Sequence, residues 1–192
     1  GNHAMFAVIT LKLEPQPRGT GFSFSSTIHV QNFPKEFEAA VEAGVREAMQ
    51  TGVLANYPTV DFKATAVDAR FHEVDSTDLS FRIAASLAFK DSAEKAGPVL
   101  LEPIMALEIE SPEEFVGDCI GDVNSRRGQV HGIDTRGNVH VIRAQAPLAQ
   151  LFGYATGLRS VTQGRASYTM QFDRYDVVPS KLQDEIVAKV HG

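Results

Sequence analysis

The sequence predicts an α+β protein made of two domains, and three observations support this fold class. Short runs of alternating apolar residues, typical of strands, are interspersed with apolar residues at helical spacing. A Gly97-Pro98 pair near the middle ends a helix and prevents its continuation. The second half contains two similar segments that lie 36 residues apart. The length of 192 residues accommodates two domains of about 100 residues each.

The first half begins with two alternating runs that predict strands, residues 7–13 and residues 22–30. A helix is predicted from Pro34 to Gly52. Its buried stripe is expected to contain Phe37, Val41, Val45 and Ala48. A third strand covers residues 59–67, and a second helix begins at Ser76. The buried stripe of this second helix is expected to contain Leu79, Ile83 and Leu87.

The second half opens with a strand in which Met105, Leu107 and Ile109 alternate with polar residues. The segment Ser111-Pro112-Glu113-Glu114 then has the spacing of a capping box, with proline at the first helical position. This pattern predicts a helix that Gly128 ends. Its buried stripe is expected to contain Val116, Cys119, Ile120 and Val123.

A further helix is predicted from about Pro147 to Val161, and it repeats the glycines of the helix before it. Its stripe is expected to contain Leu148, Leu151, Ala155 and Leu158. The matching glycines are Gly117, Gly121 and Gly128 in one segment and Gly153, Gly157 and Gly164 in the other. A glycine inside a helix costs about 1 kcal/mol relative to alanine. We therefore expect each i, i+4 pair to form a flat face that approaches a sheet closely, although chance is an alternative.

Strands near residues 129–133, 139–144 and 167–172 complete a βαββαβ order, which predicts a ferredoxin-like plait with its helices on one face of an antiparallel sheet. In the last strand, one face is shared by Tyr168, Met170 and Phe172. Ser180 and Gln183 have capping-box spacing ahead of a C-terminal helix. The stripe of that helix is expected to contain Leu182, Ile186 and Val190.

The expected organisation is therefore a first domain at residues 6–97, a second domain at residues 98–178 and a C-terminal helix at residues 179–192. Residues 1–5 are interpreted as a cloning remnant, and no signal peptide is recognised. No run of about 18 apolar residues suggests a membrane span. The net charge of −6 argues against nucleic-acid binding through a broad positive field. A single cysteine fits a reducing cytoplasm.

The sequence carries no recognisable catalytic or metal-binding arrangement. A phosphate-binding loop needs a Gly-Lys pair, and the sequence contains none. His131 and His140 flank a predicted hairpin and are interpreted as exposed strand-end histidines rather than metal ligands. Cys119 lies on a predicted core stripe, where a cysteine behaves as a small hydrophobe. We expect no catalytic residue, no metal and no bound cofactor in this chain.

Two loops are candidates for binding RNA. Residues 68–75 expose Arg70, Phe71 and His72, which together can stack on bases and contact phosphates. The alternative is that Phe71 and Val74 anchor the loop while Asp75 helps to cap the following helix. The second loop, residues 124–128, places Arg126 and Arg127 at a helix C-terminus, where arginines are favourable even without a ligand.

A series of ordered motifs carries a more specific resemblance. They are Pro34-Lys35-Glu36, Leu54-Ala55-Asn56-Tyr57-Pro58, Phe71-His72-Glu73-Val74-Asp75-Ser76, residues 98–105, Gly117-Asp118, Gly121-Asp122, Arg126-Arg127-Gly128, Pro147-Leu148, residues 152–156, Leu158-Arg159-Ser160, residues 162–167 and Met170-Gln171-Phe172. Over roughly residues 6–190, this series resembles the C-terminal domains four and five of elongation factor G.

The resemblance implies that the first domain has a left-handed β-α-β crossover, like that of a small-subunit ribosomal protein domain, and that the second is the plait. It also implies that the chain is the ribosome-binding part of a translational GTPase that promotes GTP-dependent translocation of tRNA and mRNA. The chain itself would then not be an enzyme, because GTP and Mg²⁺ bind in a GTPase domain outside it.

By the same resemblance, the tip that reaches tRNA and mRNA in the decoding centre contains Arg70, Phe71, His72 and Asp75. Contacts to rRNA are expected from Arg126, Arg127, Arg159 and Arg165. The implied partners are the rRNA of both subunits and the stalk-base proteins, in the cytoplasm, with the chain itself monomeric.

Departures from the family pattern leave alternatives open. The glycine-rich tip loop that precedes Phe6 in the family is missing. Residues 30–34 and 68–72 differ from the family's usual Gly-Gly-Val-Ile-Pro and Asp-Gly-Ser-Tyr-His. These differences point to an elongation-factor-G-like paralogue, for which ribosome recycling or tetracycline-resistance ribosome protection are alternatives. An unrelated ferredoxin-like ligand-binding module is the second alternative.

Overall fold

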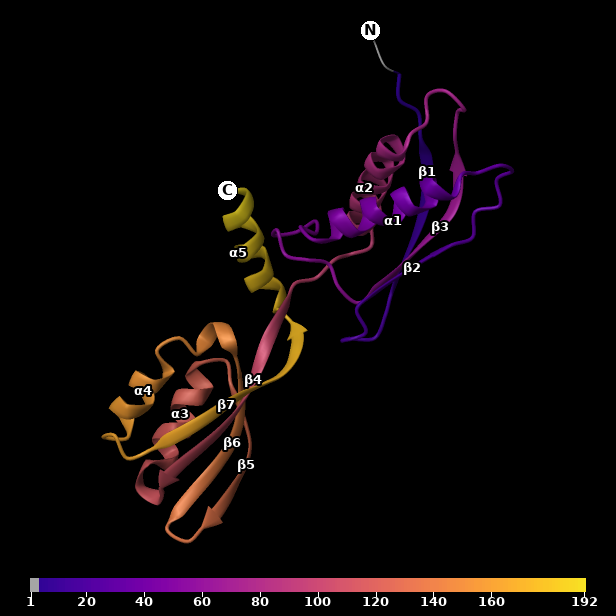
Figure 1. The fold of residues 1–192 in the computed structure, drawn as a ribbon. Coiled ribbons are helices and arrows are strands. Elements are labelled where there is room, and N and C mark those ends of the chain that lie inside the picture. Colours follow the sequence, from indigo (N-terminus) through magenta and orange to yellow (C-terminus); the bar gives the residue numbers. More distant parts are fainter. Residues whose placement is uncertain (1–3) are drawn as a thin grey trace. The chain divides into compact units, whose positions relative to one another are not determined.

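The computed structural model describes residues 4–192, which form two compact units (Figure 1). The first unit contains the chain up to Val99 together with Pro179–Gly192, and the second contains Leu100–Val178. Each unit has its own sheet and its own helices, so the α+β class predicted from the sequence is confirmed. Of the residues interpreted as a cloning remnant, 1–3 lie outside the described part of the chain.

A three-stranded sheet with the order β1-β3-β2 is the framework of the first unit. Its strands are β1 (Val8–Pro15), β2 (Phe22–Ser26) and β3 (Phe62–Arg70). β1 pairs antiparallel with β3, whereas β2 pairs parallel with β3. Parallel strands need a crossover connection, and α1 (Lys35–Met49) supplies it. The left-handed sense of this crossover stays a prediction.

The core of the first unit lies between the sheet and two helices, α1 and α2 (Asp78–Lys95). The stripe predicted for α1 is buried, with Val41 and Val45 fully inaccessible. The helices approach so closely that a Cβ at Gly44 would lie 2.3 Å from the carbonyl oxygen of Arg82. Glycine at position 44 is therefore required by the contact between the two backbones.

The predicted stripe of α2 was wrong. The exposed fractions are 54%, 45% and 60% for Leu79, Ile83 and Leu87. The fully buried residues are instead Phe81, Ala85 and Phe89. Both sets have i, i+4 spacing, so periodicity alone could not choose between them. Packing chooses the second set, because small Ala85 fits where α1 comes close and the two phenylalanines fill the space on either side.

α2 also begins two residues later than predicted. Thr77 is the N-cap, and its hydroxyl accepts a hydrogen bond from the backbone N–H of Ser80. The Ser80 hydroxyl in turn accepts a hydrogen bond from the backbone N–H of Thr77 at 2.8 Å. This reciprocal capping box satisfies two backbone donors that the start of a helix would otherwise leave unpaired.

The second unit is a four-stranded antiparallel sheet in the order β5-β6-β4-β7. Its strands are β4 (Leu101–Pro112), β5 (Gln129–Arg136), β6 (Val139–Pro147) and β7 (Ser167–Val177). Helices α3 (Val116–Ser125) and α4 (Tyr154–Val161) cover one face of the sheet (Figure 1). This element order and strand order confirm the predicted ferredoxin-like plait.

The capping box predicted at the start of α3 does not form. Pro112 is the last residue of β4, and the fully buried Ser111 hydroxyl donates to the Pro112 carbonyl oxygen at 2.9 Å. A 3₁₀ turn, η1 (Glu113–Phe115), then leads into the helix without a side-chain cap. The strand continues through the serine because residue 111 pairs with His140 of β6.

The second predicted helix of the plait is interrupted. Its first part is the 3₁₀ turn η2 (Leu148–Gln150), and α4 begins only after Gly153, whose φ of 73° breaks the helix. This break rotates the buried face, so Tyr154 is 2% exposed whereas the predicted core residue Ala155 is exposed. Leu151 and Leu158 are buried as predicted.

The matched glycines do not form flat faces against the sheet, so that prediction was wrong. A Cβ added at Gly117 or Gly121 would meet no atom within 4 Å. A Cβ added at Gly157 would lie 2.6 Å from a guanidinium nitrogen of Arg126. Gly128 has the tight environment, because a Cβ there would lie 2.6 Å from the Val123 carbonyl oxygen and 2.8 Å from that of Gln145.

These environments predict opposite effects of two glycine substitutions. Gly128→Ala is expected to lower the free energy of unfolding by about 1–3 kcal/mol, since the new methyl group overlaps two backbone oxygens that cannot move independently. Gly121→Ala is expected to raise it by about 1 kcal/mol, since the site is open and helical. Urea unfolding of both variants measures this, and a stabilising Gly128→Ala would contradict the close contact.

Two further predictions concern the last strand and the last helix. Tyr168 packs on the core, but Met170 and Phe172 of the edge strand β7 are 39% and 54% exposed. In α5 (Ser180–His191), Ser180 lies inside the helix and forms no side-chain cap, so the predicted capping box is absent.

Among the described residues, no helix is both long and apolar enough to cross a membrane.

Candidate functional site

The loop between β3 and α2 carries His72, and the segment just before β1 lies against it. The rings of Phe6 and His72 stack with centroids 4.3 Å apart and planes inclined by 26°. The His72 side chain is 60% exposed, and its Nδ1 lies 3.7 Å from Oδ2 of Asp75. This separation is too long for a hydrogen bond but close enough for an ion pair when the imidazole is protonated.

Backbone and hydroxyl hydrogen bonds join the same two segments. The Phe6 N–H donates to the Asp75 carbonyl oxygen at 3.0 Å. The Ser76 hydroxyl donates to the Phe6 carbonyl oxygen at 2.6 Å and accepts from the His72 N–H at 2.8 Å. Ser76 is 8% exposed. Both segments are therefore fixed at the position where the imidazole is presented to solvent.

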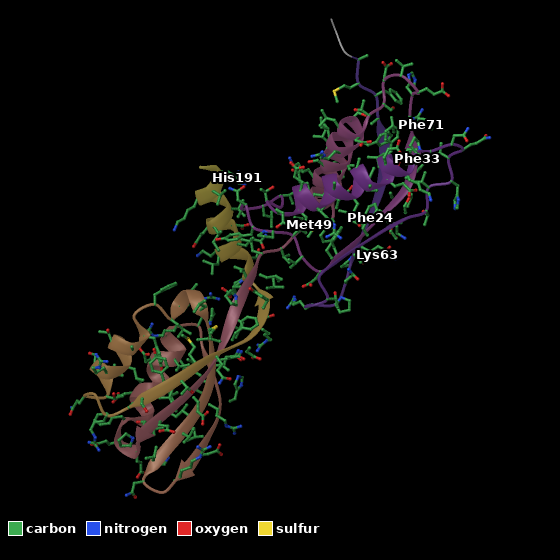
Figure 2. All side chains as sticks on the ribbon, viewed as in Figure 1. Phe24, Phe33, Met49, Lys63, Phe71 and His191 are labelled. Carbon is green, nitrogen blue, oxygen red and sulfur yellow. The ribbon has the colours of Figure 1, made fainter. Side chains whose placement is uncertain are left out.

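The other residues predicted for this tip have different environments. Arg70 is the exposed last residue of β3. Phe71 points inward and contacts Phe33 edge-on at a centroid distance of 5.8 Å (Figure 2). Val74 is 88% exposed, so Phe71 anchors the loop and Val74 does not. The cap of α2 is Thr77, and Asp75 faces the His72 ring.

Sequence reasoning missed Phe6 as part of this site, although one signal could have found it. The register of β1 and β3 pairs Val8 with Arg70. Continuing that antiparallel register by two residues places Phe6 opposite His72. Pairing the first and third predicted strands antiparallel in this register would therefore have identified the contact.

Two of the four arginines predicted to contact rRNA are engaged within the second unit. Arg126 forms an ion pair with Asp122 at 3.1 Å, donates to the Gln150 carbonyl oxygen at 2.8 Å and covers the ring of Tyr154. Arg127, at φ 54°, forms two hydrogen bonds of 2.9 and 3.0 Å with the carboxylate of Glu102. These bonds give both side chains a role in joining elements of the plait.

The other two arginines are exposed. Arg165 pairs with Glu114 at 3.0 Å, and its side chain is 56% exposed. Arg159 is exposed on α4, and no ion-pair partner is seen for it in residues 4–192. Among the four arginines, the more exposed Arg159 and Arg165 are therefore the two available to an external anion.

The cysteine and the two histidines of the second unit have separate environments. Burial raises the pKa of the Cys119 thiol above its ordinary value. His140 pairs with Thr135 across the hairpin, whereas His131 lies at the bulge in β5. Within residues 4–192, no cluster of three metal-ligating side chains occurs.

Tyr154 places a polar hydroxyl group in the core of the second unit. Its hydroxyl has no hydrogen-bond partner within the described part of the chain. Burial and the nearby Asp122 carboxylate both raise the pKa of this phenol, so it stays protonated. The ring is held edge-on by Tyr168 at 4.8 Å and covered by Arg126, which makes Tyr154 a packing residue.

Comparisons with known proteins agree with both units. The family model described as elongation factor G, domain IV, matches residues 1–97, and the model described as elongation factor G C-terminus matches residues 99–186. Elongation factor G of Aquifex pyrophilus is 52% identical over 189 residues, which cover 98% of this chain and 27% of that protein.

A solved structure is similar over the same extent. A crystal structure of a protein called ttk003000868, from Thermus thermophilus, matches with a TM-score of 0.83 and 40% identity. The match covers 95% of this chain and 27% of that one. The chain therefore spans about a quarter of the length of the relatives that it matches.

Proposed function

Because the chain belongs to the elongation factor G family, we propose that it is the ribosome-contacting part of a translational GTPase that moves tRNA and mRNA during protein synthesis. In this proposal the chain contributes binding and positioning, and a GTPase domain outside it supplies the energy. The two family models match in succession along almost the whole chain, which supports a fragment with two functional domains.

The observation that carries a contact role for the first unit is the presentation of His72. Its ring is 60% exposed, yet stacking and a network of hydrogen bonds fix the loop that carries it. An exposed ring held in this way loses little conformational freedom when it meets RNA. We propose Arg70, His72 and Asp75 as the tip that contacts tRNA and mRNA, with Phe71 as its anchor.

For the second unit we propose an rRNA contact through exposed Arg159 and Arg165, whereas Arg126 and Arg127 support the plait. Two local arginines suit a chain with a net charge of −6, because they attract phosphates without a broad positive field. A phosphate-binding loop for GTP needs a Gly-Lys pair, and the sequence contains none. GTP and Mg²⁺ are accordingly assigned to the domain outside the chain.

The experiment that tests this proposal compares the chain with the longer protein that contains it. We expect ribosomes to stimulate GTP hydrolysis by the longer protein, whereas the chain alone hydrolyses no GTP with or without ribosomes. Phosphate release measured on both proteins provides the comparison. GTP hydrolysis by the purified chain would show that the domain assignment is wrong.

A further inference from the structure

The contact between Phe6 and His72 has the geometry of a support for an exposed imidazole. The two rings are 4.3 Å apart and nearly parallel, so one face of the imidazole is covered by the phenyl ring. Asp75 faces the Nδ1 edge of the same ring at 3.7 Å. In residues 4–192 the Nε2 atom has no hydrogen-bond partner, so that edge is available to a ligand.

The backbone on both sides of this stack is fixed by one hydroxyl group. The Ser76 hydroxyl accepts from the His72 N–H and donates to the Phe6 carbonyl oxygen, which uses its proton and one of its lone pairs. The Ser80 hydroxyl approaches the same Phe6 oxygen at 3.3 Å. The Phe6 N–H is bound to the Asp75 carbonyl oxygen. The separation of the two rings is thus determined by the backbone as well as by their stacking.

We propose that Phe6, held by Ser76, is a positioning residue that fixes the His72 ring so that its Nε2 edge is presented to RNA. This inference rests on the proposed function only for the identity of the ligand; the positioning itself is a property of the first unit. Restricting one side chain before binding saves the entropy that binding would otherwise remove. Loss of the support is expected to weaken the His72 contact about two- to tenfold.

The positioning is tested first on the 192-residue chain by NMR of the His72 ring protons. In Phe6→Leu these signals are expected to lose the upfield ring-current shift and the ring to become more mobile, while Phe6→Tyr restores both. The backbone hydrogen bonds of residue 6 do not need its side chain, so the loop is retained. Phe22→Leu removes another ring contact of the same unit, the tilted pair with Phe62 at a centroid distance of 5.0 Å, and is expected to leave the His72 signals unchanged.

Unchanged His72 signals in Phe6→Leu would overturn the positioning role. An equal change of the His72 signals in Phe22→Leu would also overturn the positioning role, because it would indicate that the whole unit becomes more mobile. Thermal unfolding of each variant confirms that the comparison is made on folded protein.

The functional consequence is tested in the longer protein. Phe6→Leu is expected to slow the movement of tRNA and mRNA about two- to tenfold, and to cause no further slowing when His72 is already alanine. Additive slowing would show that Phe6 does not act through His72. If His72→Ala alone changes nothing, the proposed tip function fails, whereas the NMR result still decides the positioning.

Discussion

Replacing His72 with alanine in the longer protein is expected to slow the movement of tRNA and mRNA about tenfold, with ribosome-stimulated GTP hydrolysis unchanged. The imidazole is the polar group of the tip that is both exposed and held. One lost hydrogen bond to a charged partner is worth about 1.5 kcal/mol, which corresponds to about a tenfold change in rate. Single-round translocation and phosphate release, measured on the same samples, separate the two steps.

The matched control for this substitution is His131→Ala. His131 is also an exposed histidine, but it lies on β5 of the second unit, far along the chain from the tip. This control is expected to retain both rates. Slowing of translocation and GTP hydrolysis by the same factor in His72→Ala would indicate weaker ribosome binding as a whole, and would contradict a specific role of the tip.

Replacing Phe81 with alanine is expected to lower the free energy of unfolding of the first unit by about 3–5 kcal/mol. Phe81 is fully buried, stacks on Phe37 at 4.8 Å and meets Phe33 edge-on at 5.4 Å. Its removal leaves a cavity between α1, α2 and the segment before α1. A loss of this size is a large part of the roughly 5–15 kcal/mol that usually stabilises a domain.

Leu79→Ala is the control, because it removes a large apolar side chain from the same helix at a 54% exposed position. Its effect is expected to stay within about 0.5 kcal/mol. Urea unfolding followed by circular dichroism compares the two variants. A larger loss for Leu79→Ala than for Phe81→Ala would mean that α2 is rotated, with the stripe predicted from the sequence facing the core.

The elements that the sequence predicted well are those with one unambiguous apolar pattern. The stripe of α1 and the alternation of β4 each have a single face that can be buried, so periodicity was sufficient. The α2 helix has apolar residues on two faces, and only its contact with Gly44 of α1 decides between them. That contact joins residues far apart in the sequence, so no local pattern contains it.

The same limitation applies to the candidate site. The loop with His72 could be singled out from its composition and from the family resemblance, whereas finding its support requires the register in which β1 pairs with β3. Phe6 lies outside every local motif and reaches the loop through the pairing of β1 with β3. For Arg126 the sequence suggested too much. Its position at a helix end suggested an anion contact, but its guanidinium binds Asp122 and the carbonyl oxygen of Gln150 within the unit.

The first unit contains the helix α5, which is synthesised long after the rest of that unit. Residues 179–192 group with the first unit. The Nε2 atom of His191, which Figure 2 labels, lies 2.6 Å from the carbonyl oxygen of Leu54. The plait, residues 100–178, lies between Leu54 and His191 in the sequence and is synthesised between them. The first unit is therefore synthesised early, but its contacts with α5 form only after the plait has been made. A protein truncated before α5 is therefore expected to be less stable in the domain that is synthesised first, although the missing residues are encoded after the plait.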